Sequence, residues 1–398
     1  MADIGPRRSR ATYSEIVVWQ IPMLGLALSS AFIRESQGLS QLVALTLFFP
    51  VVFFGRGSSL SAPPGAKAFF CLSILMVSAS YLEMLPNPWG HVRDENIVLR
   101  QAYPFLILPV AIYLFAIYIN KLIDIRILHW SIPVLLMGLF AEYFFSTGIV
   151  RTYYHEAGVF YGLRNNISIL GAICAYIYFE RYNSMWMVFI IYLSANLLSL
   201  AMQNIILGVA LFFILITNYH RSIFLYLVIF STFGLILAYV FFKQAYYYDP
   251  NTAARAIWAI DGLTAWLTQG PFGFGFGVPA LRGLVYSGDQ SFEMTTGILS
   301  QDVSFFLIGH HNSFVGVIYR MGIFGIIFFY IMIRGTTPRS AKESEKIFSA
   351  LSAILFLAMF LNVGIESPTY TLGCAFIIAL ATVIRHRRAV CGDRACAL

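Results

Sequence analysis

Runs of apolar residues, separated by short polar stretches, follow one another along most of the chain. At about 20 residues for each helix that crosses a bilayer, about twelve such runs can be counted. They lie near residues 16–33, 41–54, 66–84, 99–119, 127–147, 160–179, 184–200, 204–217, 222–242, 313–333, 347–361 and 370–384. The pattern predicts an all-α fold, a polytopic membrane helix bundle of about 12 transmembrane helices in which residues 1–398 form a single transmembrane domain.

The longest apolar stretch, residues 184–216, decides how the spans are counted. As a single helix it would extend about 50 Å, whereas the hydrocarbon core of a bilayer is only about 30 Å thick. Polar residues interrupt it at Asn196, Ser199, Gln203 and Asn204. We therefore expect two spans here, and this number puts both termini on the same side of the membrane.

The composition excludes a soluble cytosolic enzyme. Of the 398 residues, 59% are hydrophobic and 11% are charged, whereas soluble domains carry about 25% charged residues. The net charge of +7 is a modest excess, and it does not suggest a nucleic-acid partner. With a cytoplasmic N-terminus, 17 of the 26 Lys and Arg residues lie inside, as the positive-inside rule expects. This predicts a multi-pass protein with both termini cytoplasmic.

The longest polar segment, residues 243–312, is expected to form one large loop outside the membrane. Within it, apolar residues recur at helical spacing at Ile257, Ile260, Leu263, Trp266 and Leu267. Asn251 or Thr252 supplies an N-cap before them. The spacing predicts an amphipathic helix over residues 253–268, one of the short amphipathic helices expected in this loop, lying on the membrane or on the outer mouth of the bundle.

Charged residues in or beside the predicted spans are candidates for function, because a charge in hydrocarbon is costly. Arg320 lies about 10 Å into the span that begins at Ser313, and Glu142 is its expected partner by depth alone. The structural alternative is that Arg320 pairs with a carboxylate or carbonyl group in the bundle. Arg164 and Arg255 lie on the outer side. They would form a cationic mouth for a phosphate-bearing lipid, although Arg164 is also explained by snorkelling to the interface.

Three glycines alternate with phenylalanine at Gly273, Gly275 and Gly277. A dinucleotide fingerprint needs Gly-x-Gly-x-x-Gly within a βαβ unit, and a phosphate loop needs Gly-Lys-Ser or Gly-Lys-Thr. The chain has neither pattern here. We expect a flexible aromatic segment that re-enters and packs on the bundle.

Three polar residues, His310, His311 and Asn312, stand directly before the span at 313–333. Neighbouring residues on a helix point about 100° apart, so the two histidines cannot share a helical metal site, and no cluster of Asp or Glu supplies further ligands. A metal site is therefore not expected. For His311 and Asn312 a capping or interfacial role stands beside proton transfer or hydrogen bonding to a substrate.

Four short stretches follow one another between residues 250 and 330. They are Arg255-Ala-Ile-Trp258, Pro271-Phe-Gly-Phe-Gly-Phe-Gly277, His311-Asn312-Ser-Phe and Gly322-Ile-Phe-Gly325. In this order and spacing they resemble the large-loop signature of the O-antigen ligase and O-antigen or exopolysaccharide polymerase superfamily. Tyr161-Gly-Leu-Arg-Asn-Asn166 is a looser match.

The resemblance implies a metal-independent, all-helical membrane glycosyltransferase of the GT-C type in the bacterial inner membrane, with no cofactor. Its donor would be an oligosaccharide linked to a polyprenyl diphosphate such as undecaprenyl diphosphate. His311 and Arg255 would be catalytic. The residues expected to bind substrate are Arg164, Arg320, His310, Asn312 and Gln203. The family commonly has Ser-Arg at the polar break between the seventh and eighth spans, where this chain has Gln203-Asn204, so Arg164 or Arg320 would supply the second cationic contact.

The chemistry of such a donor agrees with where the polar residues lie. A polyprenyl diphosphate keeps its tail in lipid and its sugar in water, so the reacting bond lies at the outer interface. The protein must then stabilise the departing diphosphate and orient or deprotonate an acceptor hydroxyl. The expected function is polymerisation of lipid-linked repeat units, with membrane lipid and other polysaccharide assembly proteins as further partners. The alternatives are a ligase that transfers the glycan to lipid A core and, from another class, a transporter of polysaccharide or lipid-linked sugar.

Overall fold

The computed structural model describes residues 64–88, 93–123, 250–279 and 312–334. Single positions are also described at 184, 186, 190, 209, 310, 357, 359, 360, 371, 374, 375, 378, 379 and 382. The elements are α4 (Ala66–Tyr81), α5 (Glu95–Ile123), α13 (Pro250–Gln269) and α17 (Ser313–Arg334). These ranges contain helices and no strand, which agrees with the predicted all-α class. The expected number of twelve spans, and the division of residues 184–216, depend on residues outside the described ranges.

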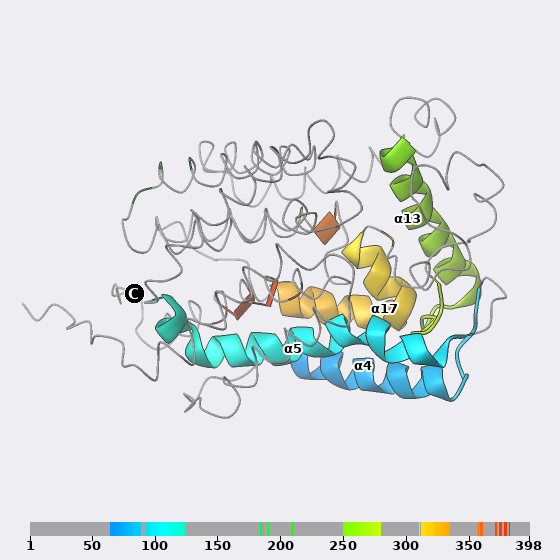
Figure 1. Cartoon of the computed structure of the whole chain (residues 1–398), viewed down its shortest axis with the longest axis horizontal. Helices are drawn as coiled ribbons and strands as arrows, with labels where there is room; N and C mark the ends of the chain where they lie inside the picture. Colours follow the sequence, from blue (N-terminus) through cyan, green and yellow to red (C-terminus); the bar gives the residue numbers. More distant parts are fainter. Residues whose placement is uncertain are drawn as a thin grey trace, which may run out of the picture.

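Three of the four helices pack as a layer that carries the fourth at one end. Figure 1 shows α4 and α5 side by side and α13 at one end of the layer; α17 packs on α4, and α13 packs on α17. The rings of Phe69 in α4 and Phe329 in α17 have their centroids 5.9 Å apart. The hydroxyl of Ser73 lies 3.9 Å from the sulfur of Met321. Ser73 comes after Phe69 in α4, but its partner in α17 comes before the partner of Phe69. The two helices therefore run antiparallel.

Helix α17 is sharply bent at Gly322, where the backbone has φ 65° and ψ −161°. Fifteen residues would separate two rings by about 22 Å along a straight helix. The ring centroids of Phe314 and Phe329 are 5.6 Å apart. The helix thus consists of two arms that fold toward each other, a first arm at residues 313–321 and a second arm at residues 323–334.

Within the described ranges, one helix is long and apolar enough to cross a membrane, residues Ser313–Met332 of α17. Helix α4 and residues Ile97–Tyr113 of α5 are shorter apolar helices. The arms of α17 extend only about 14 Å and about 18 Å at 1.5 Å per residue, less than a hydrocarbon core of about 30 Å. The helix predicted at 313–333 is therefore present, but it is not the straight span that the apolar run suggested.

The loop helix predicted over residues 253–268 is confirmed as α13, with two details that differ. The helix begins at Pro250, so the expected caps Asn251 and Thr252 lie inside its first turn, where proline is favoured at the start. The buried residues described in the helix are Trp258 and the small residues Ala256, Ala259, Gly262 and Ala265. Leu267, expected on the packed face, is 69% exposed. Small side chains at Gly262 and Ala265 let His310, Phe274 and Tyr319 pack closely against α13.

Candidate functional site

The chain that leaves α13 packs between the helix ends as an ordered segment, Pro271–Pro279, which we call the Gly-Phe segment. Residues 273–279 are all buried. Gly273, Gly275 and Gly277 have φ of 93°, 71° and 77°, values that side chains disfavour. A Cβ on Gly273 would lie 2.5 Å from the backbone nitrogen of Gly322. The expected packing on the bundle is confirmed, and the alternating glycines are explained by the left-handed backbone and this close approach.

The Gly-Phe segment supplies the backbone hydrogen bonds that the bend in α17 removes. In a regular helix the amide of Ile323 would donate to the carbonyl of Tyr319. Here it donates to the carbonyl of Pro271, at 3.1 Å, and the carbonyl of Tyr319 accepts from the amide of Phe274, at 2.8 Å. The carbonyl of Arg320 accepts from the amide of Gly275, at 2.9 Å. The bend is thus stable because another part of the chain satisfies its exposed groups.

The guanidinium of Arg320 is held by the same segment. Its side chain is 3% exposed. Nη1 donates to the carbonyl of Gly275 at 3.3 Å and also to that of Val278, and the guanidinium carbon lies 5.3 Å from the centroid of the Tyr319 ring. The structural alternative given for Arg320, pairing with carbonyl groups, is confirmed. Glu142, the partner expected by depth, lies outside the described residues.

A second arginine, Arg93, which lies two residues before α5, binds the Gly-Phe segment. Its Nη1 donates to the carbonyl of Phe276 at 3.1 Å, and its Nη2 donates to those of Phe274 at 3.2 Å and Leu85 at 2.9 Å. Burial, followed by the positive charge of Arg320, lowers the pKa of the Arg93 guanidinium. Arginine remains charged at neutral pH even so. No pattern in the sequence around Arg93 indicated this role.

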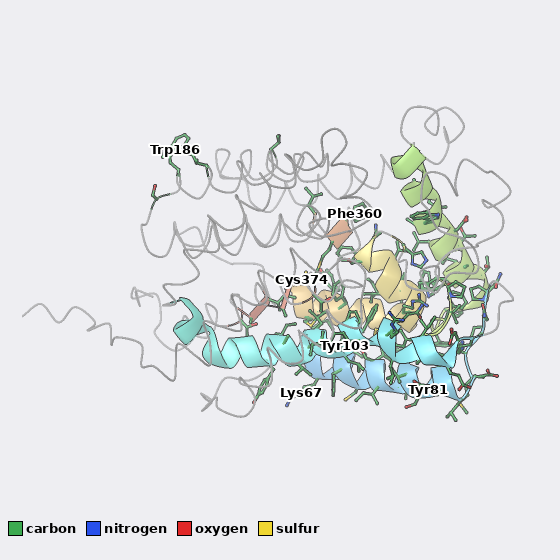
Figure 2. All side chains as sticks on the ribbon, in the orientation of Figure 1. Lys67, Tyr81, Tyr103, Trp186, Phe360 and Cys374 are labelled. Carbon is green, nitrogen blue, oxygen red and sulfur yellow. The ribbon has the colours of Figure 1, made fainter. Side chains whose placement is uncertain are left out.

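Two polar side chains bind the remaining backbone groups of the segment. The amide of Phe276 donates to the hydroxyl of Ser80 in α4, at 2.8 Å. Gln101 in α5 accepts from the amide of Gly277 at 2.7 Å and donates to the carbonyl of Val278 at 3.1 Å. The Gly-Phe segment therefore ties α13 to α4, α5 and α17 at once. Figure 2 shows side chains from these elements gathered where the lower end of α13 meets the other three.

His310 lies between α13 and the first arm of α17, and its side chain is fully buried. Its ring centroid is 4.5 Å from that of Tyr319, whose ring lies 4.7 Å from that of Phe274. A Cβ on Gly262 of α13 would come within 2.4 Å of the His310 Nε2 atom. The imidazole thus occupies a notch that exists because residue 262 is glycine.

Asn312 caps the first arm of α17. Its Oδ1 accepts from the amides of Phe314, at 3.0 Å, and Val315, at 3.1 Å, the arrangement of an N-cap residue. The structural role considered for Asn312 is therefore confirmed. His311, for which the same capping role was considered, lies outside the described residues, so its role stays a prediction.

The other predicted site residues are described only in part. Arg255 belongs to α13, about 10 Å along the helix axis before Gly262 at 1.5 Å per residue, but its side chain is outside the description. Arg164 and Gln203 also lie outside it. His311 directly follows His310, which contacts α13 at Gly262. The structure therefore brings the helix that bears Arg255 against the stretch of chain that leads to His311.

No metal-binding group is apparent in the part of the chain that the structure describes, where no three His, Cys, Asp or Glu residues lie close enough to hold an ion. The metal-free mechanism stays a prediction. Comparison of the chain with protein-family models and with curated proteins finds no match. The function must therefore be argued from the residues and their arrangement.

Proposed function

We propose that this protein is a membrane glycosyltransferase that polymerises glycan repeats, moving a glycan from a polyprenyl-diphosphate-linked donor to a lipid-linked repeat unit at the periplasmic face. One observation carries the proposal. The stretches that resemble the polymerase and ligase superfamily lie up to 70 residues apart, yet α13, the Gly-Phe segment, the chain before α17 and the bend at Gly322 contact one another. Such convergence is expected if the stretches together build one site.

In this mechanism Arg255 binds the donor diphosphate and His311 acts on the acceptor hydroxyl. The diphosphate is already a good leaving group, so the protein needs to stabilise its growing negative charge and to orient or deprotonate the acceptor. Nη1 of Arg320 is engaged by carbonyls of the Gly-Phe segment. This favours Arg164 over Arg320 as the second cationic contact.

The proposed setting is the bacterial inner membrane, with both termini in the cytoplasm and residues 243–312 outside. The apolar composition of α17 and of the shorter helices in α4 and α5 supports the membrane location, and the sidedness rests on the distribution of Lys and Arg. Reporter fusions at Ser287 and Ser340 are expected to give opposite sidedness. The same sidedness at both positions would overturn the proposed pairing of spans.

The polymerase differs from a ligase only in its acceptor, and a transporter is the alternative of another class. Transporters often use broken helices whose free backbone groups bind the substrate, and α17 is broken at Gly322. Here, however, the carbonyls of Tyr319 and Arg320 bind the amides of the Gly-Phe segment. These backbone groups at the break are therefore paired within the protein and do not serve as a binding site for a transported substrate. This favours transfer chemistry over transport.

The reaction can be tested with purified protein in chelator and a single lipid-linked oligosaccharide. A polymerase is expected to produce a ladder of longer products. Conversion only after lipid A core is added would identify a ligase. Activity only with a divalent ion would overturn the metal-free mechanism, and translocation without any new glycosidic bond would identify a transporter.

Arg255 is tested by changing its geometry while keeping its charge. Arg255→Lys retains the charge but loses the bidentate contact to phosphate. Loss of such a contact costs about 2 to 4 kcal/mol of transition-state stabilisation, so we expect most of the activity to disappear at normal protein levels. Lys67→Ala removes an exposed cation of α4 and serves as the control. Full activity in Arg255→Ala would refute the assignment.

His311 is tested by His311→Asn, which keeps a polar side chain but removes the group that titrates near neutral pH. We expect turnover to fall and the limb of its pH dependence near the histidine pKa to disappear. Unchanged turnover would exclude His311 from acceptor activation.

A further inference from the structure

A fully buried histidine next to the proposed catalytic histidine has no place in the mechanism above. The Nε2 and Cδ2 atoms of the His310 imidazole face Gly262, and the ring packs against that of Tyr319, with the ring centroids 4.5 Å apart. Tyr319 is itself fixed, because its hydroxyl donates to the carbonyl of Pro279 at 2.9 Å. Because the ring is fully buried, a substrate cannot contact it in this structure.

The contact joins the two stretches that carry the proposed chemistry. Gly262 is on α13, two turns after Arg255, and His310 is bonded directly to His311. A shift of His310 across α13 therefore moves His311 relative to Arg255. We propose that His310 is a positioning residue which, by filling the notch over Gly262, sets the distance between His311 and Arg255; this rests on the function proposed above.

The size of the effect follows from the geometry of the notch. A methyl group at residue 262 would lie 2.4 Å from Nε2 of His310, whereas carbon atoms in contact are about 3.5 to 4.0 Å apart. The ring would have to move by about 1 Å, and a misplacement of about 1 Å can cost about 100-fold in rate. Gly262→Ala should therefore impair turnover although it adds a single carbon atom.

The test compares four full-length proteins, the wild type, Gly262→Ala, His310→Ala and the double variant, with kcat measured per mole of folded protein in the ladder assay. Each single variant is expected to lose about 100-fold in kcat while KM changes less than threefold. Both changes break the same contact, so the double variant is expected to lose about 100-fold as well and not about 10,000-fold. Thr264→Ala, an exposed position on α13, should behave like the wild type.

A pH profile separates positioning from direct chemistry. The shape of the kcat profile should survive in His310→Ala, because the titrating group in the proposal is His311. Loss of a limb in His310→Ala, full activity of Gly262→Ala, or multiplied losses in the double variant would each overturn the proposal. If Gly262→Ala does not fold, His310→Ala and its pH profile carry the test, since that change only removes atoms.

If the proposed glycan transfer is wrong, the same four proteins give a different result. In that case the wild type forms no product with any acceptor, while the unfolding temperatures of the four proteins still report on the notch. Non-additive losses of thermal stability would then uphold the contact and reject its link to glycan transfer.

Discussion

The two arms of α17 have similar apolar sequences but different surroundings. In the first arm every residue from Val315 to Met321 is buried, including Arg320. In the second arm burial is confined to one side, at Gly325, Phe329 and Met332. The exposed residues of the second arm are Ile323, Phe324, Ile327, Tyr330 and Ile331.

This difference arises from what each arm contacts. The first arm is enclosed by α13, the Gly-Phe segment and His310, whereas the second arm packs on α4 and leaves its other face open. An apolar helix that exposes large apolar side chains on one side is typical of a helix that faces lipid, and an apolar helix that is buried all round is typical of a core. An uninterrupted apolar run can therefore contain a core helix and a peripheral helix, joined at a single glycine.

The largest expected effect is at the junction of the arms. Gly322→Val would force a branched side chain into a backbone conformation that only glycine adopts readily, with its Cβ 2.2 Å from the carbonyl carbon of Phe272. We expect a loss of about 3 kcal/mol or more, measured as a lower unfolding temperature and a smaller monodisperse fraction in detergent. Ile327→Val, on the open face, is the control. A stable Gly322→Val protein would mean that the arms are not separated by this bend.

The next effect concerns the arginines that enclose the first arm. Arg320→Met and Arg93→Met keep much of the side-chain volume but leave buried carbonyl groups without donors, at about 2 to 4 kcal/mol for each variant. Because both arginines hold the same segment, the double variant should lose less than the sum. Unfolding temperatures, with Lys67→Met as the exposed control, measure this coupling. Strictly additive losses of stability would show that the two arginines stabilise the segment independently.

A smaller effect is expected at the start of the first arm. Asn312→Ala removes the acceptor for two helix amides and should cost about 1 kcal/mol. Asn312→Asp retains a capping oxygen and should stay close to the wild type in the same unfolding measurement. Equal losses in both variants would mean that the amide nitrogen of Asn312, and not its oxygen, is the important group.

The smallest effect compares one change in both arms. Ile318→Val in the first arm removes a buried methylene group and should cost about 1 kcal/mol. Ile327→Val in the second arm, where the side chain is 42% exposed, should cost less than about 0.5 kcal/mol. The free energies of unfolding of the two variants, measured by chemical denaturation in the same detergent, test this difference. Equal costs would contradict the division into core and peripheral arms.

The helices themselves could be predicted from the sequence because each follows a local pattern. Apolar runs located α4, α5 and α17, and helical spacing located α13 within one turn at its start. The buried side of α13 could not be predicted in this way. It depends on His310, Phe274 and Tyr319, which pack closely against the small side chains at Gly262 and Ala265.

The site was less accessible to prediction because its main contacts join distant residues. Arg93 binds carbonyls more than 180 positions later in the chain, and no residue pattern around it indicates this. The bend at Gly322 depends equally on the Gly-Phe segment. Asn312 was different, because a cap is a local interaction and the polar residue before an apolar run already suggested it.

The exchange of hydrogen bonds at the bend has a consequence for protein engineering. The Gly-Phe segment and α17 each complete the other's backbone pairing, so neither is an independent module. A chimaera that imports the loop of a related protein but keeps the native Gly322 helix would leave buried amides and carbonyls unmatched on both sides of the graft. Loop and helix must be exchanged together, with junctions placed before α13 and after the second arm of α17.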